Sequence, residues 1–514
     1  MIRWMTWGGM MLAAGVAWAG DWTQWRGSQG DGIASNSPAL IEGWGTNGPN
    51  RLWVSEQIPA GEDGGFSSVT IAGGREYVFV NWKTQEPIAT RKLTDGHLQQ
   101  LGWIPNKLPE DLIKAMEEAR VSDERAKLNG QEIKKWIDKW VADHVAEDQK
   151  KAVAPIVASR ITRGKAALPL ETLSKVAEIR NKEFAGEAEF GQWLAASGLD
   201  TQTVAAVRAL VPTSKPVAKD VIVCLDADGK TVWKKEYPGR PSGWGSSSTP
   251  CVTGGRCYVA GGKTLYCLDA ATGNEIWSKG LAGGDISSSP VLVDGVVAIL
   301  GGMLYGINGA DGNPLWSQKE ISGNNPSPAV WHKGDASYVL CNADKGVACV
   351  EPKTGKILWT APGGGSGTVT VEGDVMVLLG KTKEVGLVAY RLSTEKAERI
   401  WSQDITDRGT TPLIRDGCVY VVGAGRVGCW ALADGALKWE KKQGGEIASP
   451  ILADGKIVAL VGGVLHLIRA APDAYALLGK ASPGAATCSS PSIADGRLYL
   501  RLTNAVACFD LKKP

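Results

Sequence analysis

The chain has 514 residues, of which 44% are apolar, so it is long enough for a large core or for a repeat fold. Its formal net charge is only +2, which removes any electrostatic argument for nucleic acid or an acidic membrane as a partner. Glycine is abundant, with 65 residues, and 21 Trp stand against only 5 Phe. This composition is typical of many short strands joined by tight turns.

The first residues have the pattern of a secretory signal peptide. Arg3 supplies a positive charge, residues 4–16 are apolar, and Ala17-Trp18-Ala19 fits the small-x-small cleavage pattern. The apolar stretch is too short to span a membrane comfortably, and no Cys precedes Cys224, so a lipid-modified cysteine at the cleavage site is not expected. We therefore expect a cleaved signal peptide and a periplasmic or secreted protein that does not span the membrane. An apolar leading strand is the alternative.

An internal repeat of about forty residues decides the predicted fold. Its anchor is a Ser-Pro or Thr-Pro step, and the copies, two of them degenerate, are Ser68-Val69, Thr249-Pro250, Ser289-Pro290, Ser327-Pro328, Thr368-Val369, Thr411-Pro412, Ser449-Pro450 and Ser490-Pro491. After each anchor, strands of about five residues alternate with turns such as Asp294-Gly295. Four strands and this period are those of one propeller blade. The sequence therefore predicts an all-β, eight-bladed β-propeller with four-stranded blades.

One Trp stands near the end of the fourth strand in most repeats. These residues are Trp53, Trp233, Trp277, Trp316, Trp359, Trp401 and Trp439. An indole at one fixed place per blade can wedge between adjacent sheets while its N–H reaches a backbone acceptor. We interpret these Trp as structural docking residues and not as a platform for a cofactor.

The two ends of the repeat region complement each other. The eighth copy stops after its third strand, at residues 506–511, and residues 51–55 have the pattern of an orphan fourth strand. Pairing of residues 52–55 with 506–510 would close the ring and leave no open sheet edge.

A charged segment with helical periodicity interrupts the first repeat. The apolar residues Ile133, Trp136, Ile137, Trp140, Val141 and Val145 mark one helical face. Further helices are expected near 109–121, 150–161, 170–182, 187–196 and 201–211, with Asp200 as a cap for the last. The predicted organisation is a signal peptide (1–19), a leader (20–50), propeller (51–84), an α-helical insertion in blade 1 (85–218) and propeller again (219–514). The insertion holds only His97 and His144 and no Cys, so we expect no haem.

The blade pattern resembles the pyrroloquinoline-quinone-like (PQQ-like) repeat family. The match rests on Ser-Pro at the start of each blade and on endings such as Ala271-Thr272-Gly273-Asn274-Glu275-Ile276-Trp277, and it covers residues 51–82 and 220–514. The segment Asp21-Trp22-Thr23-Gln24-Trp25-Arg26-Gly27 is similar to the leader of exported bacterial propellers in this family. The resemblance implies either a quinoprotein alcohol dehydrogenase or a non-enzymatic propeller like BamB of outer-membrane assembly, and a shared fold cannot choose between them.

Residues just before each first strand should ring one mouth of the central channel. The candidates are Asp285, Asn324, Asn325, Asp407, Arg408 and Glu446, which are either cofactor-binding or ordinary solvated loop residues. A quinoprotein of this family would need Ca²⁺ held by oxygen ligands, and the resemblance also implies an adjacent Cys-Cys pair, which this chain lacks. Asp226-Ala227-Asp228-Gly229 lacks the spacing of a calcium loop.

Two functions remain open from the sequence. The favoured one is a non-catalytic scaffold of the bacterial cell envelope that binds another envelope or secreted protein through the propeller faces and the helical insertion, with no cofactor, no metal and no nucleic acid. The alternative is an oxidoreductase that depends on PQQ and Ca²⁺, with its site at the channel mouth.

The ten cysteines are too sparse for a disulfide scaffold. Assumed hairpin lengths place Cys418 opposite Cys429, Cys257 opposite Cys267, and Cys341 opposite Cys349. Directly opposed β-carbons are wider apart than a disulfide prefers, so we expect mostly free thiols, with Cys418–Cys429 as the best candidate for a bond.

Overall fold

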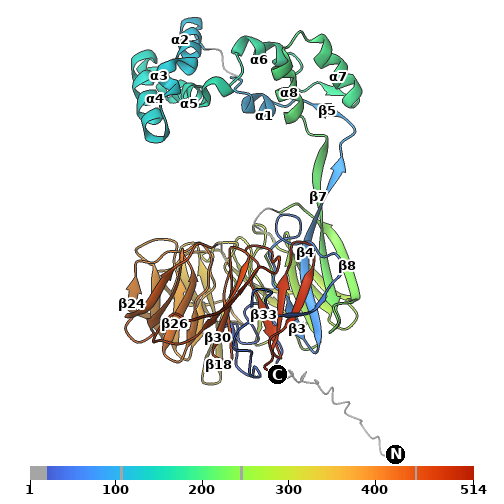
Figure 1. Cartoon of the computed structure of the whole chain (residues 1–514), viewed down its shortest axis with the longest axis vertical. Helices are drawn as coiled ribbons and strands as arrows, with labels where there is room; N and C mark the ends of the chain where they lie inside the picture. Colours follow the sequence, from blue (N-terminus) through green and yellow to red (C-terminus); the bar gives the residue numbers. More distant parts are fainter. Residues whose placement is uncertain (1–19, 105–107, 243–246, 446–447) are drawn as a thin grey trace, which may run out of the picture. The chain divides into compact units, whose positions relative to one another are not determined.

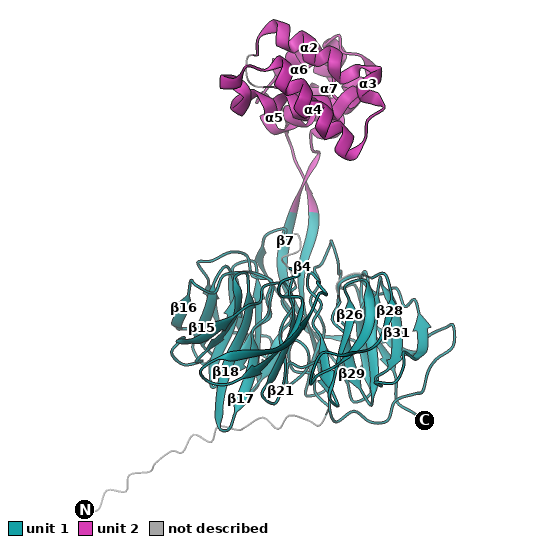
Figure 2. Ribbon diagram, turned by 90° about the vertical axis from the view of Figure 1, so that its left-hand side faces the viewer, with its two compact units in different colours: residues 1–84, 217–514 teal, residues 85–216 magenta. Residues whose placement is uncertain are grey.

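The computed structural model describes residues 20–104, 108–242, 247–445 and 448–514. The predicted signal peptide and Glu446 lie outside these residues. The chain divides into two compact units, one of residues 1–84 and 217–514 and one of residues 85–216 (Figure 2). In sequence, the second unit lies between two strands of the first.

The first unit consists of β-sheets. Its described residues form eight sheets of four or five strands, which we number 1 to 8 along the chain. Sheet 1 contains β3 (Thr70–Ala72), β4 (Arg75–Pro87), β7 (Ser214–Leu225) and β8 (Thr231–Gly239), and sheet 2 contains β9 (Cys251–Thr253), β10 (Arg256–Gly261), β11 (Thr264–Asp269) and β12 (Glu275–Gly280). Sheet 3 contains β13 (Val291–Val293), β14 (Val296–Leu300), β15 (Leu304–Asn308) and β16 (Pro314–Gln318), and sheet 4 contains β17 (Ala329–Lys333), β18 (Ala336–Ala343), β19 (Gly346–Val350) and β20 (Ile357–Ala361).

Sheets 5 to 8 repeat the same order and recruit two strands from the leader. Sheet 5 contains β21 (Thr370–Glu372), β22 (Val375–Leu379), β23 (Leu387–Leu392) and β24 (Ala397–Gln403), and sheet 6 contains β25 (Leu413–Arg415), β26 (Cys418–Gly423), β27 (Arg426–Ala431) and β28 (Leu437–Lys442). Sheet 7 contains β29 (Ile451–Ala453), β30 (Lys456–Val461), β31 (Val464–Arg469) and β32 (Leu477–Ala481), with β1 (Ile33–Ala34) added beside β29. Sheet 8 contains β33 (Ser492–Ala494), β34 (Arg497–Arg501), β35 (Val506–Asp510) and β2 (Asn50–Val54).

Each sheet packs against the next through an apolar cluster, and sheets 7, 8 and 1 share the largest one. In Figure 1 the blue strands β3 and β4 accordingly lie beside the red strand β33. The sheets therefore form a closed ring, the arrangement of a β-propeller.

The first hairpin of several sheets is set by Asp-Gly turns. Asp294, Asp416, Asp454 and Asp495 have φ between 46° and 51°, and each is followed by a glycine with positive φ. A two-residue turn with both central residues left-handed matches the twist of antiparallel strands. These short turns keep each first strand next to the second.

In seven of the eight described sheets, a Trp in the outer strand docks on the following sheet. Trp233 Nε1 donates to Ala270 O at 3.1 Å, and Trp316 Nε1 donates to Pro352 O at 2.7 Å. The equivalent acceptors for Trp53, Trp277, Trp359, Trp401 and Trp439 are the carbonyls of Ala227, Gly309, Ser393, Leu432 and Ala471. A turn glycine lies under the indole: a β-carbon on Gly355 would approach Trp316 Cδ2 to 2.4 Å.

The strand residue opposite each docking Trp is small in seven of the described sheets. These residues are Cys224, Cys267, Gly306, Cys349, Ala389, Cys429 and Cys508. A β-carbon on Gly306 would approach Trp316 Cε2 to 2.1 Å, so little space remains beside the indole. Five of the cysteines therefore serve as small apolar residues beside a Trp.

The expected cross-strand cysteine pairs are wrong. Cys418 lies opposite Ala431, Cys257 opposite Leu268, and Cys341 opposite Ala348. The last two hairpins have two-residue turns and not the expected three, which moves the register by one, and the Cys418 hairpin turns at Ala424-Gly425, one residue later than expected. The nine buried cysteines are all thiols in the structure.

The expected closing strand is confirmed. β2 pairs with β35 in antiparallel register, with Trp53 opposite Cys508 and Val54 opposite Ala507. Sheet 7 is completed differently, because Gly479 stands opposite Leu467 where other sheets carry the docking Trp. Trp44 of the leader covers this glycine, and a β-carbon there would meet Trp44 Cε2 at 2.7 Å. The leader thus supplies a strand to sheet 8 and an indole to sheet 7.

The second unit is helical, with one small sheet of β5 (Arg91–Lys92) and β6 (Glu183–Phe184). Its helices are α1 (Asp95–Gln100), α2 (Glu110–Val121), α3 (Asp123–Ala126), α4 (Gly130–His144), α5 (Glu147–Arg163), the 3₁₀ turn η1 (Gly164–Ala166), α6 (Leu170–Ala177), α7 (Glu187–Ala196) and α8 (Thr201–Leu210). Asp200 caps α8 as expected, accepting from Thr203 N at 2.9 Å. One apolar cluster joins α2, α4 and α5, and a second joins α1 with α6, α7 and α8.

A buried ion network links the segments of the helical unit. Arg160 is 1% exposed and bonds both carboxylate oxygens of Glu117, the carbonyl of Gly102 at 2.6 Å and the carbonyl of Leu168 at 2.5 Å. Arg120 contacts the same carboxylate at 2.7 Å. Burial opposes ionisation of Glu117, but the two guanidinium groups outweigh it and lower the pKa of this carboxyl.

The two His of this unit have local partners. His97 forms a capping box with Thr94 at the start of α1, and His144 stacks on Trp140 with ring centroids 4.2 Å apart. Among the described helices, none is both long and apolar enough to cross a membrane.

Candidate functional site in the central cavity

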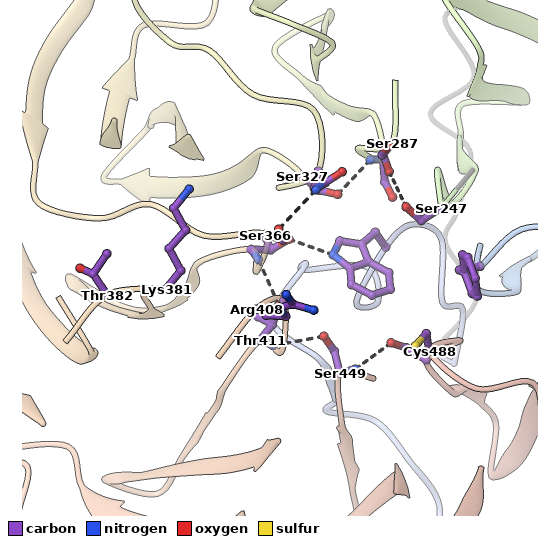
Figure 3. A pocket seen from close by; sticks show the side chains of 17 residues that line it. Ser247, Ser287, Ser327, Ser366, Lys381, Thr382, Arg408, Thr411, Ser449 and Cys488 are labelled. Carbon is purple, nitrogen blue, oxygen red and sulfur yellow. Dashed lines mark hydrogen bonds between the residues drawn. The ribbon is translucent and has the colours of Figure 1, made fainter. Parts of the chain in front are cut away.

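Hydroxyl groups join neighbouring sheets where the first strands begin. The backbone N–H of Ser68 donates to Thr249 Oγ1 at 3.0 Å, and Thr249 N donates in turn to Ser289 Oγ at 2.9 Å. The same step recurs from Ser289 to Ser327, Thr368 to Thr411, Thr411 to Ser449 and Ser449 to Ser490 (Figure 3). The anchors therefore form two hydrogen-bonded runs around the channel, one from Ser68 to Ser327 and one from Thr368 to Ser490, and Ser68 Oγ joins the two runs by donating to Ser490 O at 3.0 Å.

A cavity of about 740 Å³ opens inside this ring. Hydroxyl side chains dominate its lining: Ser247, Ser287, Ser289, Ser327, Ser366, Thr368, Thr382, Thr411, Ser449 and Ser490. Trp25 and Phe66 contribute aromatic surface, and Asn325, Lys381, Arg408, Gly409 and Cys488 complete the described lining. This volume lies within the range of small-molecule sites.

The leader places Trp25 in the cavity wall. Trp25 Nε1 donates to Thr368 Oγ1 at 3.0 Å, which ties the indole to sheet 5. The next residue, Arg26, is 2% exposed, and its guanidinium donates to the carbonyls of Thr411, Pro412, Pro450 and Asp31. Burial lowers the pKa of Arg26 to about 10, so the side chain remains a cation at neutral pH. The Trp-Arg step of the leader therefore connects sheets 5, 6 and 7.

A second buried arginine lies behind the opposite part of the wall. Arg501 is 1% exposed and donates to Ser67 O, to Ser67 Oγ at 2.9 Å and to Pro59 O at 2.6 Å. Ser67 follows Phe66, which lines the cavity. Burial lowers the pKa of Arg501 to about 9, and no described carboxylate forms an ion pair with it.

Of the five predicted channel-mouth residues that the structure describes, two line the cavity, Asn325 and Arg408. Asp285 instead lies 3.6 Å from Arg240 and is half exposed. Asn324 accepts from Gly302 N at 2.7 Å, and Asp407 accepts from the backbone N–H groups of residues 409, 410 and 424. These side chains organise loops, and they are not aimed at a common centre.

Sequence reasoning missed Trp25, Phe66 and Lys381. The Ser-Pro anchors were the usable signal, because residues next to them line the channel. Trp25 and Lys381 stand far from any anchor in sequence, so only the fold brings them there.

The described lining does not fit a calcium-bound quinone site. Calcium prefers six to eight oxygen ligands that usually include carboxylates, and oxidation of an alcohol needs a base. The described lining offers hydroxyls, one amide and two cations but no carboxylate and no imidazole. Within the described ranges, no group of three or more His, Cys, Asp or Glu side chains is arranged so that it could hold a metal ion.

Comparison with known proteins places the chain in a family. A sequence model described as "Outer membrane protein assembly factor BamB" matches residues 218–441 and 343–512, more than half of the chain. No curated protein sequence matches the chain. Among solved structures, BamB from Moraxella catarrhalis is 16% identical, with a TM-score of 0.49 over 57% of this chain and 89% of its own. The quinohemoprotein alcohol dehydrogenase from Comamonas testosteroni is 13% identical, with a TM-score of 0.41 over 58% of this chain and 73% of its own. On the family match, the chain belongs to the family of the outer membrane protein assembly factor BamB.

Proposed function

We propose that this protein is a non-catalytic binding scaffold of the bacterial cell envelope, with another envelope or secreted protein as its partner. The eight sheets are then the blades of one eight-bladed propeller. The helical unit of residues 85–216 is then an insertion in the first blade. Residues 1–19 act as the export signal in this proposal.

The observation that carries the non-catalytic part is the chemistry of the cavity wall. Half of its ten described hydroxyl groups accept a hydrogen bond from a backbone N–H of a neighbouring sheet, namely those of Ser289, Ser327, Thr411, Ser449 and Ser490. The described lining contains no carboxylate or imidazole that could take a proton from a substrate. The polar groups therefore hold the ring together and do not form a reaction centre.

The rim of the propeller supports a binding role. The outer strands β2, β8, β12, β16, β28 and β32 each expose a large apolar side chain; among them are Leu315 at 46% and Leu437 at 54%. Outer strands of this kind give a partner both apolar contacts and free backbone groups.

A turnover assay tests the non-catalytic claim directly. The full chain, with PQQ and Ca²⁺ added, should show no dye-linked oxidation of alcohols or sugars. Turnover that disappears in Arg408→Gln, but persists in the matched surface variant Lys383→Gln, would overturn the proposal.

Site-specific photo-crosslinking in the envelope tests the binding claim. A crosslinking residue at Leu437 or Leu315 should give one discrete adduct, identified by mass spectrometry, whereas the same residue at the buried position Val421 should give none. Absence of any discrete adduct from the rim and from exposed positions of the helical unit would contradict a scaffold.

A further inference from the structure

The chain contains three Asn-Gly steps, at Asn47-Gly48, Asn129-Gly130 and Asn308-Gly309. In such a step the side-chain amide carbon lies within reach of the next backbone nitrogen, and glycine has no side chain to obstruct closure of a five-membered ring. Ring closure needs a free backbone N–H and an amide side chain that is free to turn. The fold meets these two conditions differently at the three steps.

The step at Asn308 is held on both sides of its peptide bond. Gly309 N donates to Gly295 O at 2.9 Å, and Asn308 Oδ1 accepts from Ala310 N at 2.9 Å. Gly309 O in turn accepts from the docking indole Nε1 of Trp277 at 3.2 Å. Rotation of this peptide would therefore break contacts between sheets 2 and 3.

The step at Asn47 is exposed, but its backbone nitrogen is held in a turn of the leader. Gly48 N donates to Gly45 O at 3.0 Å. A β-carbon on Gly48 would lie 2.7 Å from that of Ala481, so the turn packs closely on sheet 7. Pro49 follows directly and is buried. The nitrogen that would attack is thus engaged, and the turn that carries it is fixed.

The step at Asn129 has neither restraint. Asn129 and Gly130 are both exposed, at the junction of α3 and α4. The Asn129 side chain makes no capping hydrogen bond, and Gly130 N has no hydrogen-bond partner among the described residues. Apart from its own stretch of backbone, no atom lies within 4 Å of the position of a β-carbon on Gly130. Both groups that ring closure requires are therefore free.

We propose that Asn129 is a site of spontaneous deamidation in the folded protein, whereas Asn47 and Asn308 are protected by the fold. Gly130 N loses its proton to hydroxide and attacks Asn129 Cγ, and the bond from Cγ to Nδ2 breaks as ammonia leaves with a proton from water. Water then opens the cyclic imide at either carbonyl, which yields aspartate or isoaspartate at this position. The net reaction consumes water, releases ammonia and needs no oxidant, metal or enzyme. It is independent of the proposed scaffold function.

The two products affect α4 differently. Aspartate places a carboxylate at the start of the helix, where the partial positive charge of the helix favours an anion and a free backbone N–H is available to the carboxylate oxygen. Isoaspartate lengthens the backbone by a methylene group and displaces the chain ahead of α4. Since α4 contributes Ile137, Trp140 and Val141 to an apolar cluster of the helical unit, the modification alters the stability of that unit.

Peptide mapping of the full chain by mass spectrometry tests the proposal. Incubation at mildly alkaline pH should convert Asn129, detected by the mass gain of replacing an amide with a carboxylate and by labelling with an isoaspartyl methyltransferase. Breaking one hydrogen bond corresponds to about a fivefold change in rate, so Asn47 and Asn308 should react at least that much more slowly. In urea, where the fold is lost, the three steps should react at similar rates.

Two results would each overturn the proposal: equal rates at the three steps in the folded protein, or an Asn129 that reacts in urea but not in the folded protein. Stability gives a second readout. Asn129→Asp should raise the urea midpoint of the helical unit, whereas Asn47→Asp, which makes the same change of charge in the leader, should leave that midpoint unchanged. An unchanged or lower midpoint in Asn129→Asp would contradict the effect assigned to the aspartate product.

Discussion

The two units bury arginine in different ways. In the helical unit, Arg160 is neutralised by Glu117, and a second arginine shares the same carboxylate. In the propeller, Arg26 and Arg501 are buried as deeply but are held by backbone carbonyls. The ring brings loop carbonyls of several sheets together around each arginine, whereas helices use most of their carbonyls internally, so Glu117 binds Arg160 beside the two non-helical carbonyls of Gly102 and Leu168.

The two units also differ in how often a stabilising contact is repeated. The propeller repeats one Trp contact and one hydroxyl link from sheet to sheet, so each is one of many. Each of the described ion networks between segments of the helical unit, those of Glu117 and of Glu187, occurs once and is not repeated. We therefore expect point substitutions to act more strongly on the helical unit, and ring closure to be the weak point of the propeller.

Removal of the leader should have the largest effect. Deleting residues 20–56 takes away β2, Trp44, Trp25 and Arg26 together, and it exposes the edge of β35. We expect a lower melting temperature by several degrees or aggregation, measured by differential scanning fluorimetry and light scattering. A monomeric protein with an unchanged melt would show that closure does not depend on the leader.

Breaking the ion network should be the next largest effect. Glu117→Leu leaves two buried guanidinium groups without a counterion, which costs about 3–5 kcal/mol in comparable buried pairs. The loss of stability should lower the urea midpoint of the helical unit, followed by circular dichroism at 222 nm, while the urea midpoint of the propeller stays unchanged. Glu118→Gln, an exposed neighbour, serves as the control. Because the pKa of Glu117 is lowered, its contribution should be present above the unfolded pKa and be lost as the pH falls through the folded value.

A carboxyl group between sheets 1 and 8 should make the stability of the propeller fall as the pH rises from acid to about 8. Glu76 is 1% exposed, and burial raises its pKa to about 8, although a hydrogen bond with Tyr499 and the charge of Arg497 act in the opposite direction and Asp226 adds to the rise. Its folded pKa is above the unfolded value, so this group favours the folded state at low pH and the advantage is lost as pH rises towards 8.

The expected slope is about 1.4 kcal/mol per pH unit between the two pKa values. Urea midpoints at pH 6, 7 and 8 should fall in the wild type and stay nearly level in Glu76→Gln. An exposed substitution, Glu275→Gln, should keep the wild-type slope. Equal slopes in all three proteins would mean that Glu76 is ionised in the folded state.

Excision of the helical unit should have the smallest effect on the propeller. Replacing residues 85–216 by a short Gly-containing turn leaves β4 and β7 adjacent in sheet 1. The urea midpoint of the trimmed propeller should match that of the full chain, and the excised unit should give a helical spectrum. Failure of the trimmed chain to fold would make the helical unit part of the propeller core.

The repeat was predictable because its signals are local. Asp-Gly turns, the Ser-Pro anchors and a Trp at a fixed place each act within a few residues, and counting strands was enough to pair residues 52–55 with 506–510. The cysteine register failed because a change of one residue in a turn shifts every opposed pair.

The cavity was predictable only in part, because its wall is assembled from residues far apart in sequence. Arg408 follows from its place before a first strand, but Trp25 reaches Thr368 across 343 residues. One feature of the sequence points to the role of Trp44. The seventh repeat has Gly479 where a docking Trp is expected, and the leader has a Trp that belongs to none of the repeats.

The position of Trp44 also bears on the order of folding. Its partner Gly479 and the partners of β2 at residues 507–510 are synthesised long after Trp44 and β2. Early sheets can form while the chain is growing, but Trp44 and β2 have no final partner until the seventh and eighth sheets have been synthesised. Closure therefore joins the most distant parts of the chain and has the largest entropic cost of loop closure. For this reason, we expect it to be the slow, final step of folding. Until that step, the edge of sheet 8 and the Gly479 surface of sheet 7 stay open to other chains, and chaperone protection is needed most at that moment.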